Sequence, residues 1–461
     1  MTHPKNARMD ALVIFGATGD LAKLETFPAL VGLVERGVLE VPVIGVAKSG
    51  WNLEQFRDYA VASLRHNNID PDGDPAKRML DLLRYIDGDL TDDATFRQLA
   101  AMLPRDAGTL FYLEVPPSLF ATITQGIRRA GLAAGARVMV EKPFGTDLRS
   151  ARELNATMHQ TFPEDAIYRV DHWLGLDPVA QVLATRFANT VLEPVLNRTY
   201  VESIQITMAE AFDVADRGHF YDRTGAIRDV LQNHMLQILA VVLTEPPPGA
   251  ALEHLTDVTA NAVKSLVPLS VDQVVRGQYD GYRHVVGVAS TSTVETFAAV
   301  RLRADSWRWA DVPILIRVGK CMPVTATEIT IRFRPAPQNV FGVEPFGSMN
   351  TLRFRIWPET RIAMTLAGKK PGFGPRPQLN ELAFNEQPGA DMRPYDRLIG
   401  AALGGMRILF AREDAVEAAW RIVDPVLGDA VPVHRYPRGS WGPAEADGLL
   451  PAGQRWYDPQ A

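Results

Sequence analysis

Three polar segments of the sequence contain the residue types that acid–base catalysis needs. They are residues 141–145 (EKPFG), 169–175 (RVDHWLG) and 228–234 (RDVLQNH). Oxidation of a hydroxyl-bearing carbon needs a base that takes the hydroxyl proton while a hydride leaves the same carbon. A histidine held by a carboxylate suits this task, because the carboxylate fixes the tautomer and stabilises the imidazolium. Asp171 and His234 could form such a pair, although their spacing does not show that they meet.

A glycine-containing turn near the N-terminus has the features of a nucleotide-binding loop. Its residues are Gly16, Ala17, Thr18, Gly19, Asp20, Leu21 and Ala22. The turn follows a predicted buried strand and opens a predicted helix, whose N-terminus offers unpaired N–H groups and the positive end of its dipole to a pyrophosphate. An ordinary strand-to-helix turn is the alternative, because a shortened glycine fingerprint is a weak signal by itself.

The end of the second predicted strand bears on the choice between NAD and NADP. An NAD-dependent enzyme usually has an acidic residue there that binds the ribose hydroxyls, whereas this sequence has Lys48 and Ser49. Both side chains suit a 2′-phosphate, so the sequence favours NADP. Because lysine lacks the planar fork of arginine, the preference could be incomplete, and NAD stays an alternative coenzyme.

In the first third of the chain, the elements that must position these residues are buried strands that alternate with helices. Apolar runs at residues 11–15, 41–46, 109–115 and 136–140 predict buried strands, and residues 21–36 predict a helix. Strands that alternate with helices predict a parallel sheet that is covered on both faces.

The second half of the chain shows a different pattern, in which apolar and polar residues alternate strictly. The alternation occurs in residues 328–334, 352–356 and 362–366. It predicts a half-exposed antiparallel hairpin. We therefore expect a second, α+β domain with a large antiparallel sheet, and a boundary near residue 170.

The composition excludes several classes of protein. A length of 461 residues favours two domains, and a net charge of -6 argues against a nucleic-acid partner. The single cysteine, Cys321, excludes an intramolecular disulfide and a cysteine-rich zinc site, and we expect no metal. Residues 1–10 lack an apolar signal core, and runs such as 238–243 are too short to span a bilayer. These features predict a cytoplasmic protein with no membrane partner.

The segments described above together resemble the glucose-6-phosphate dehydrogenase family. The matching residues are 13–23, 141–145, 169–175, 186–189 and 228–234, and the resemblance extends over nearly the whole chain. It implies a Rossmann-like coenzyme domain (8–172) and an α+β domain (173–461) whose large antiparallel sheet forms a dimer interface, hence a homodimer or homotetramer. It also implies NADP-dependent oxidation of the anomeric carbon of glucose 6-phosphate to the 1,5-lactone, a reaction of the oxidative pentose phosphate pathway.

The resemblance further implies roles for individual residues. His234 is implied as the general base and Asp171 as its carboxylate partner. Lys142 is implied between coenzyme and substrate. The other implied substrate-binding residues are His172, which would donate to the substrate phosphate, Glu210, Asp229 and Lys320. Residues 16–22, Lys48 and Lys142 are implied to bind the coenzyme, and Ser49 is added to them because its hydroxyl suits a 2′-phosphate.

Several positions depart from the family pattern. Trp173 and Leu176 replace a tyrosine and a lysine that bind the substrate phosphate in the family, and Thr325 replaces a basic residue. Glu25 replaces a lysine after the coenzyme turn. Indole has one donor and leucine has none, and each lost charge-assisted hydrogen bond costs roughly 1.5–3 kcal/mol of binding.

These departures leave three functions open. The first is glucose-6-phosphate 1-dehydrogenase, with Arg317, Arg332 or Arg334 as substitute cations. The second is a 1-dehydrogenase of an unphosphorylated or differently substituted sugar. The third is a non-catalytic homologue that binds the coenzyme, against which the retention of Asp171 and His234 argues.

Overall fold

Internal contacts divide the chain into two units, each assembled from three stretches of sequence. The computed structural model describes residues 8–104, 108–338, 340, 342, 350–385 and 392–460. Unit 1 comprises residues 1–177, 249–256 and 390–417, and unit 2 comprises residues 178–248, 257–389 and 418–461. Residues 1–7, which carry most of the segment used to judge a signal sequence, lie outside the described residues.

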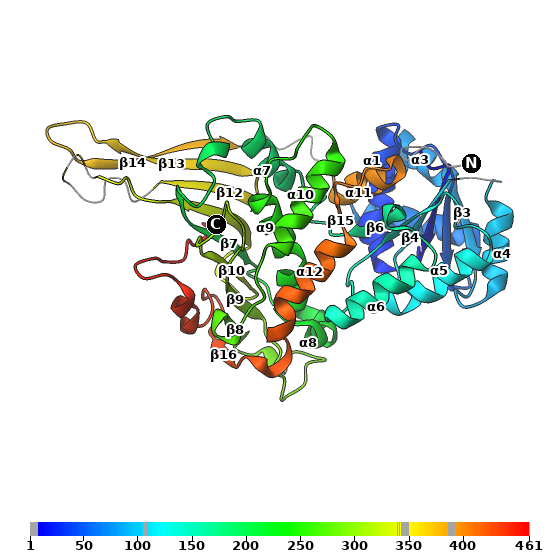
Figure 1. Cartoon of the computed structure of the whole chain (residues 1–461). Coiled ribbons are helices and arrows are strands. Elements are labelled where there is room, and N and C mark those ends of the chain that lie inside the picture. Colours follow the sequence, from blue (N-terminus) through cyan, green and yellow to red (C-terminus); the bar gives the residue numbers. More distant parts are fainter. Residues whose placement is uncertain are drawn as a thin grey trace. The chain divides into compact units, whose positions relative to one another are not determined.

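Unit 1 contains a seven-stranded sheet with the order β15-β6-β5-β4-β1-β2-β3 (Figure 1). The strands are β1 (Ala11–Phe15), β2 (Val43–Ala47), β3 (Leu83–Asp87), β4 (Thr109–Leu113), β5 (Arg137–Val140), β6 (Ile167–Val170) and β15 (Phe410–Ala411). Strands β1 to β6 pair in parallel, and β15 is antiparallel to β6. The predicted parallel sheet is thus confirmed, and the strand order reverses between β1 and β4, where such sheets bind ligands.

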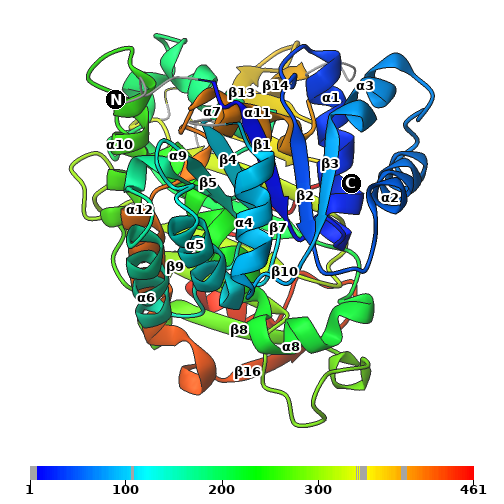
Figure 2. The same ribbon diagram turned by 90° about the vertical axis from the view of Figure 1, so that its right-hand side faces the viewer.

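Helices cover both faces of this sheet because its strands are apolar on both sides. In β1, Leu12 and Ile14 belong to one core cluster, while Val13 and Phe15 belong to another. The first cluster includes residues of α1 (Phe27–Glu35), α2 (Leu53–His66), α3 (Asp74–Leu82) and α11 (Pro394–Gly404). The second includes residues of α4 (Asp93–Met102), α5 (Phe120–Arg129) and α6 (Leu148–His159). Figure 2 shows α4 and α5 running alongside the strands.

The helix predicted at residues 21–36 forms in two parts. A π-helical turn, η1 (Ala22–Thr26), comes first, and α1 continues from it. π-helical turns are rare and occur often at functional sites. Here the turn lies directly after the glycine-containing loop, so the change in helical pitch falls beside the expected coenzyme site.

Unit 2 contains a nine-stranded sheet with the order β14-β13-β12-β11-β7-β10-β9-β8-β16. The strands are β7 (Val201–Ala209), β8 (Val274–Tyr279), β9 (Phe297–Leu302), β10 (Ile314–Gly319), β11 (Ala326–Phe333), β12 (Thr351–Trp357), β13 (Arg361–Lys369), β14 (Pro377–Asn385) and β16 (Val433–Tyr436). Most neighbours are antiparallel, while β10 with β7 and β16 with β8 are parallel. The predicted hairpin is confirmed, since β12 and β13 pair from Thr351 opposite Thr365 to Arg355 opposite Arg361.

Strand β11 corrects the prediction of a half-exposed hairpin. Its polar residues Glu328 and Thr330 are 5% and 2% exposed. The strand lies between β7 and β12, and Arg355 of β12 forms an ion pair with Glu328 at 3.4 Å. A buried carboxylate needs such a partner. The alternation therefore predicted the strand correctly but not the burial of its polar face.

The remaining α-helices, together with the π-helix η6, are α7 (Asp177–Phe187), α8 (Gly218–Ala226), η6 (Ile227–Met235), α9 (Leu236–Leu243), α10 (Leu252–Lys264) and α12 (Glu413–Val423). Arg186 of α7 is buried and donates to the carbonyl oxygens of Val241, Val242 and Thr244 at 2.8–3.1 Å. This guanidinium satisfies the free carbonyl groups at the end of α9. Among the described residues, no helix combines the length and apolar composition that crossing a membrane requires.

Candidate active site

The turn after β1 has the geometry of a pyrophosphate cradle. Gly16 has φ +86°, and a Cβ atom there would lie 2.3 Å from the carbonyl oxygen of Glu114. Only glycine fits this approach between the ends of β1 and β4. Ala17 and Ala22 are buried, whereas Gly19 and Asp20 are exposed. The turn thus leaves exposed backbone where a dinucleotide would lie, and its residues fit such a coenzyme.

The end of β2 lies beside this turn. The hydroxyl groups of Thr18 and Ser49 are 2.8 Å apart. Lys48 forms an ion pair with Asp89 at 2.8 Å, and the two side chains are 74% and 40% exposed. Asp87, the last residue of β3, accepts hydrogen bonds from the backbone N–H groups of Ser49 and Gly50. Ser49 thus lies beside the glycine-containing turn, and the Lys48–Ser49 segment is bonded to two carboxylates that the sequence analysis missed.

The ends of β4 and β5 carry two carboxyl groups. Tyr112 donates to Glu141 at 2.7 Å, and Thr26 donates to Glu114 at 2.5 Å. Burial raises the pKa of Glu141 to about 7 and that of Glu114 to about 8. Glu141 directly precedes Lys142, which is partly buried. Glu114 was not singled out in the sequence, although an acidic residue that directly follows a buried strand is a signal that could have found it.

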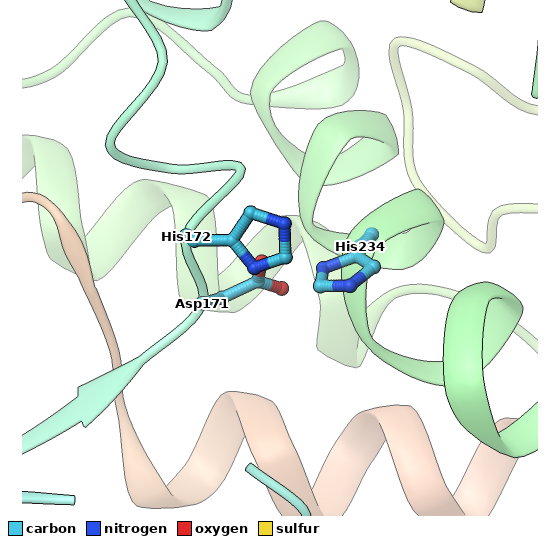
Figure 3. Close-up of side chains that lie close together, drawn as sticks. All are labelled: Asp171, His172 and His234. Carbon is cyan, nitrogen blue, oxygen red and sulfur yellow. The ribbon is translucent and has the colours of Figure 1, made fainter. Parts of the chain in front are cut away.

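Two of the predicted site residues follow β6. Asp171 is 3% exposed, and its Oδ1 accepts a hydrogen bond from the backbone N–H of Trp173 at 3.1 Å. The ring of His172 lies 6.2 Å from that of Trp173. Figure 3 shows Asp171 and His172 on this segment of unit 1, and His234 on helix η6. Because Asp171 and His234 belong to different units, their pairing stays a prediction.

Helix η6 is a π-helix and is fixed at its beginning by charged residues of unit 2. Gly225 has φ +70°, a non-helical conformation that produces a kink shortly before η6 begins. Glu295 accepts from the N–H of Ile227 at 3.1 Å, where a carboxylate complements the helix dipole. Arg276 in turn pairs with Glu295 at 2.9 Å. His234, near the other end of η6, is 3% exposed.

The structure brings two predicted substrate-binding residues into contact. Lys320 Nζ lies 2.6 Å from Glu210 Oε2, and the side chains are 10% and 20% exposed. The same ammonium lies over the rings of Phe212 and Tyr221. Burial, followed by the charges of Asp229 and Glu210, raises the pKa of Tyr221 well above its usual value. Tyr221 thus belongs to the same polar cluster as Glu210, Lys320 and Asp229. The sequence analysis did not identify Tyr221, because no spacing in the sequence indicates this contact.

Two of the three arginines considered as substitute phosphate ligands have carboxylate partners within unit 2. Arg317 is 1% exposed and lies 2.5 Å from Asp458, and Arg332 lies 2.6 Å from Glu202. Arg334 donates to the carbonyl oxygen of Arg198 at 3.2 Å. The hydroxyl of Thr325 accepts from the N–H of Ala211. A phosphate could recruit Arg317 or Arg332 only by displacing a carboxylate.

The other departures from the family pattern have ordinary structural settings in unit 1. Trp173 is 8% exposed, and Leu176 is partly buried. Burial raises the pKa of Glu25, while the charge of Arg393 opposes that shift.

His159, Glu164 and Glu413 are close enough to suggest a metal site, but Arg169 and Arg407 also contact Glu164. The positive charges of these two arginines make the binding of a metal ion at this cluster unfavourable.

Comparison with known proteins connects this geometry to a family. Residues 13–181 match the model "Glucose-6-phosphate dehydrogenase, NAD binding domain", and residues 183–457 match the corresponding C-terminal domain. The chain belongs to the glucose-6-phosphate dehydrogenase family. It is 43% identical to glucose-6-phosphate 1-dehydrogenase 1 of Mycobacterium tuberculosis, with 98% of this chain and 96% of the relative covered.

Solved structures of the family agree with this assignment. The chain is similar to glucose-6-phosphate 1-dehydrogenase from Mycobacterium avium, with a TM-score of 0.92, 43% identity and coverage of 98% and 99% of the two chains. It is also similar to a glucose-6-phosphate dehydrogenase in complex with glucose 6-phosphate, with a TM-score of 0.90, 31% identity and coverage of 98% and 100%. The predicted combination of a Rossmann-like domain and a domain with a large antiparallel sheet is confirmed.

Proposed function

We propose that the chain is an NADP-dependent glucose-6-phosphate 1-dehydrogenase, an oxidoreductase of the oxidative pentose phosphate pathway that acts on a CH–OH group. The observation that carries the proposal is the match of both family models along the chain. Relatives with that activity in their names are similar over 98% of its length. NADP is the coenzyme of the family, and the turn after β1 fits a dinucleotide because Gly16 allows the tight approach to the end of β4 that such a turn needs.

His234 is the general base of the proposed reaction. Its imidazole takes the proton of the anomeric hydroxyl, while the hydride leaves C1 and the carbonyl group of the 1,5-lactone forms. NADP, when bound, supplies the acceptor for that hydride. Asp171 orients the imidazole and stabilises its protonated form. Both side chains are 3% exposed, and in such surroundings the attraction between a carboxylate and an imidazolium is little screened by water.

The remaining site residues position the sugar. Lys142, after β5, lies between coenzyme and substrate, and His172 donates to the substrate phosphate. Glu210 and Asp229 accept from sugar hydroxyl groups. Lys320, already beside Glu210, completes a polar surface in unit 2, and binding of the sugar must compete with this ion pair.

A sugar without the phosphate is the second candidate substrate. It is favoured by the engagement of Arg317 and Arg332 with carboxylates, and by Trp173 and Leu176, which replace phosphate ligands. With fewer cations for the phosphate, binding of glucose 6-phosphate weakens by about tenfold or more for each lost contact.

A comparison of substrates tests the proposal. The purified chain is assayed by coenzyme reduction with glucose 6-phosphate and with glucose, each under NADP and NAD. Higher catalytic efficiency with glucose 6-phosphate supports the first function, and higher efficiency with glucose replaces it by the second. Tight NADP binding without turnover of any sugar would instead identify a non-catalytic homologue.

We further propose that residues 8–172 and 173–461 act as coenzyme and substrate domains of a cytoplasmic homodimer or homotetramer. The outer strands β13 and β14 support association, since Leu366, Leu382 and Phe384 are 38%, 64% and 60% exposed. Exposed apolar side chains of this kind mark protein interfaces. Sedimentation of the purified chain measures the oligomeric order, and a monomer at micromolar concentration would contradict this part of the proposal.

A further inference from the structure

The end of β2 presents several hydrogen-bond donors in one short loop. They are the Lys48 ammonium, the Ser49 hydroxyl and the backbone N–H groups of Ser49 and Gly50. In a Rossmann-like domain this position meets the adenosine ribose. A cation beside successive N–H groups suits an anion such as a 2′-phosphate. The loop is tied to the coenzyme turn through Thr18 and Ser49, so its donors lie where the ribose would bind.

These donors already have partners within the chain. Asp89 Oδ2 lies 2.8 Å from Lys48 Nζ. Asp87 Oδ1 lies 2.9 Å and 2.8 Å from the backbone nitrogens of Ser49 and Gly50. The Ser49 hydroxyl is paired with that of Thr18. Two carboxylates therefore hold the donors that a 2′-phosphate would use.

Asp89 also accepts hydrogen bonds from Thr91, in addition to its contact with Lys48. The backbone N–H and the hydroxyl of Thr91 donate to its Oδ1 at 2.9 Å and 2.7 Å. The hydrogen bonds from Lys48 and Thr91 keep the pKa of Asp89 well below its usual range. Its negative charge is thus fixed beside Lys48 at every pH at which the coenzyme would bind.

We propose that Asp87 and Asp89 set the coenzyme preference by opposing a 2′-phosphate at the end of β2, so that NAD is accepted alongside NADP. The inference rests on the proposed use of a nicotinamide dinucleotide. A 2′-phosphate must take Lys48 from Asp89 and lie beside two negative charges. The 2′-hydroxyl of NAD brings no charge and can donate to a carboxylate.

The expected effect is moderate because the pair is exposed to water. A unit charge about 4 Å away, surrounded by water, changes affinity by roughly fivefold. The attraction of Lys48 and the repulsion of Asp89 act on the same phosphate with opposite signs. Their near cancellation is what leaves the choice between NADP and NAD open.

Charge-removing variants test this balance. In Asp89→Asn, the ratio of kcat/KM with NADP to that with NAD should rise by about fivefold to tenfold, while the amide oxygen still accepts from Thr91. Lys48→Met should lower the ratio by a similar factor. In the double variant the ratio should return to within about twofold of wild type, because both opposing charges are gone.

Glu153→Gln is the matched control. It removes one negative charge from another exposed ion pair of unit 1, Arg149 with Glu153 at 3.1 Å. The control should leave the NADP to NAD ratio unchanged. If Asp89→Asn changes the ratio no more than Glu153→Gln does, the assignment is wrong.

A binding measurement keeps this inference separate from the proposed sugar oxidation. Calorimetry with the full chain compares 2′,5′-ADP, which carries the 2′-phosphate, with 5′-AMP, which lacks it. Asp89→Asn should tighten 2′,5′-ADP by about fivefold to tenfold and leave 5′-AMP within about twofold. Equal changes for both ligands, or none for either, would overturn the inference. Absence of turnover with any sugar would overturn only the proposed function.

Discussion

The coenzyme side of unit 1 and the sugar side of unit 2 hold their charged groups in different surroundings. Lys48 and Asp89 form an exposed pair at the end of β2, whereas Lys320 and Glu210 form a largely buried one. An exposed pair contributes about 0–1 kcal/mol, but loss of one partner from a buried pair costs about 3–5 kcal/mol. We therefore expect exposed charges to adjust which ligand is preferred, and buried charges to contribute more to the stability of the fold.

The largest effect should come from the buried residue His234 of unit 2, which we propose as the base. We predict that His234→Asn lowers turnover by about two to four orders of magnitude, because proton removal loses its acceptor. Coenzyme affinity, measured by calorimetry, should change by less than about twofold. A variant that keeps a tenth of normal turnover would exclude His234 as the base.

The second-largest effect should come from restoring two phosphate-binding side chains to unit 1. Trp173→Tyr combined with Leu176→Lys should raise catalytic efficiency with glucose 6-phosphate relative to glucose by about one to three orders of magnitude, since each restored contact contributes roughly 1.5–3 kcal/mol. The two single variants are the controls and should each give part of the gain. An unchanged ratio in a folded, active protein would show that these side chains do not face the phosphate.

Lys48 and Lys320 allow a direct test of the contrast between the exposed and the buried ion pair. We predict that Lys320→Met lowers the free energy of unfolding by about 3 kcal/mol, because it leaves Glu210 without its ion-pair partner in a mostly buried position. Lys48→Met should lower it much less, because that ion pair is exposed to water. Urea unfolding measures both, and a second change of Glu210→Leu should recover much of the loss. Equal costs for the two lysines would refute the contrast between the regions.

The last prediction concerns the pH dependence of stability, which involves a buried carboxyl group of unit 1. Burial raises the pKa of Glu114 to about 8, so the folded state binds its proton more tightly than the unfolded state. Stability from this group is present at low pH and is lost as the pH rises from about 5 to about 8. In Glu114→Gln, which stays neutral, the unfolding free energy should decline clearly less over that range than it does in the wild type. Thermal unfolding at several pH values tests this, and parallel curves for variant and wild type would contradict it.

Much of the fold was predictable because its signals are local. The apolar run at 11–15 forms β1 with those bounds, and the alternation at 352–356 and 362–366 forms the β12–β13 hairpin. The burial of Glu328 was not predictable, because exposure of a polar face depends on what lies beside the strand. Strand β15 was missed because two residues that follow a helix carry no periodic pattern.

The sequence by itself determined the glycine turn, the alternation of strands and helices, and the family. These features depend on backbone freedom, on hydrophobic period and on motifs within a few residues. Only the tertiary structure decided which charges meet. Asp87 and Asp89 reach the Lys48 loop because β3 pairs with β2. Glu210 reaches Lys320 because β7 pairs with β10. Contacts of this kind follow from the register of strands that are distant in the chain, and no spacing between the residues encodes them.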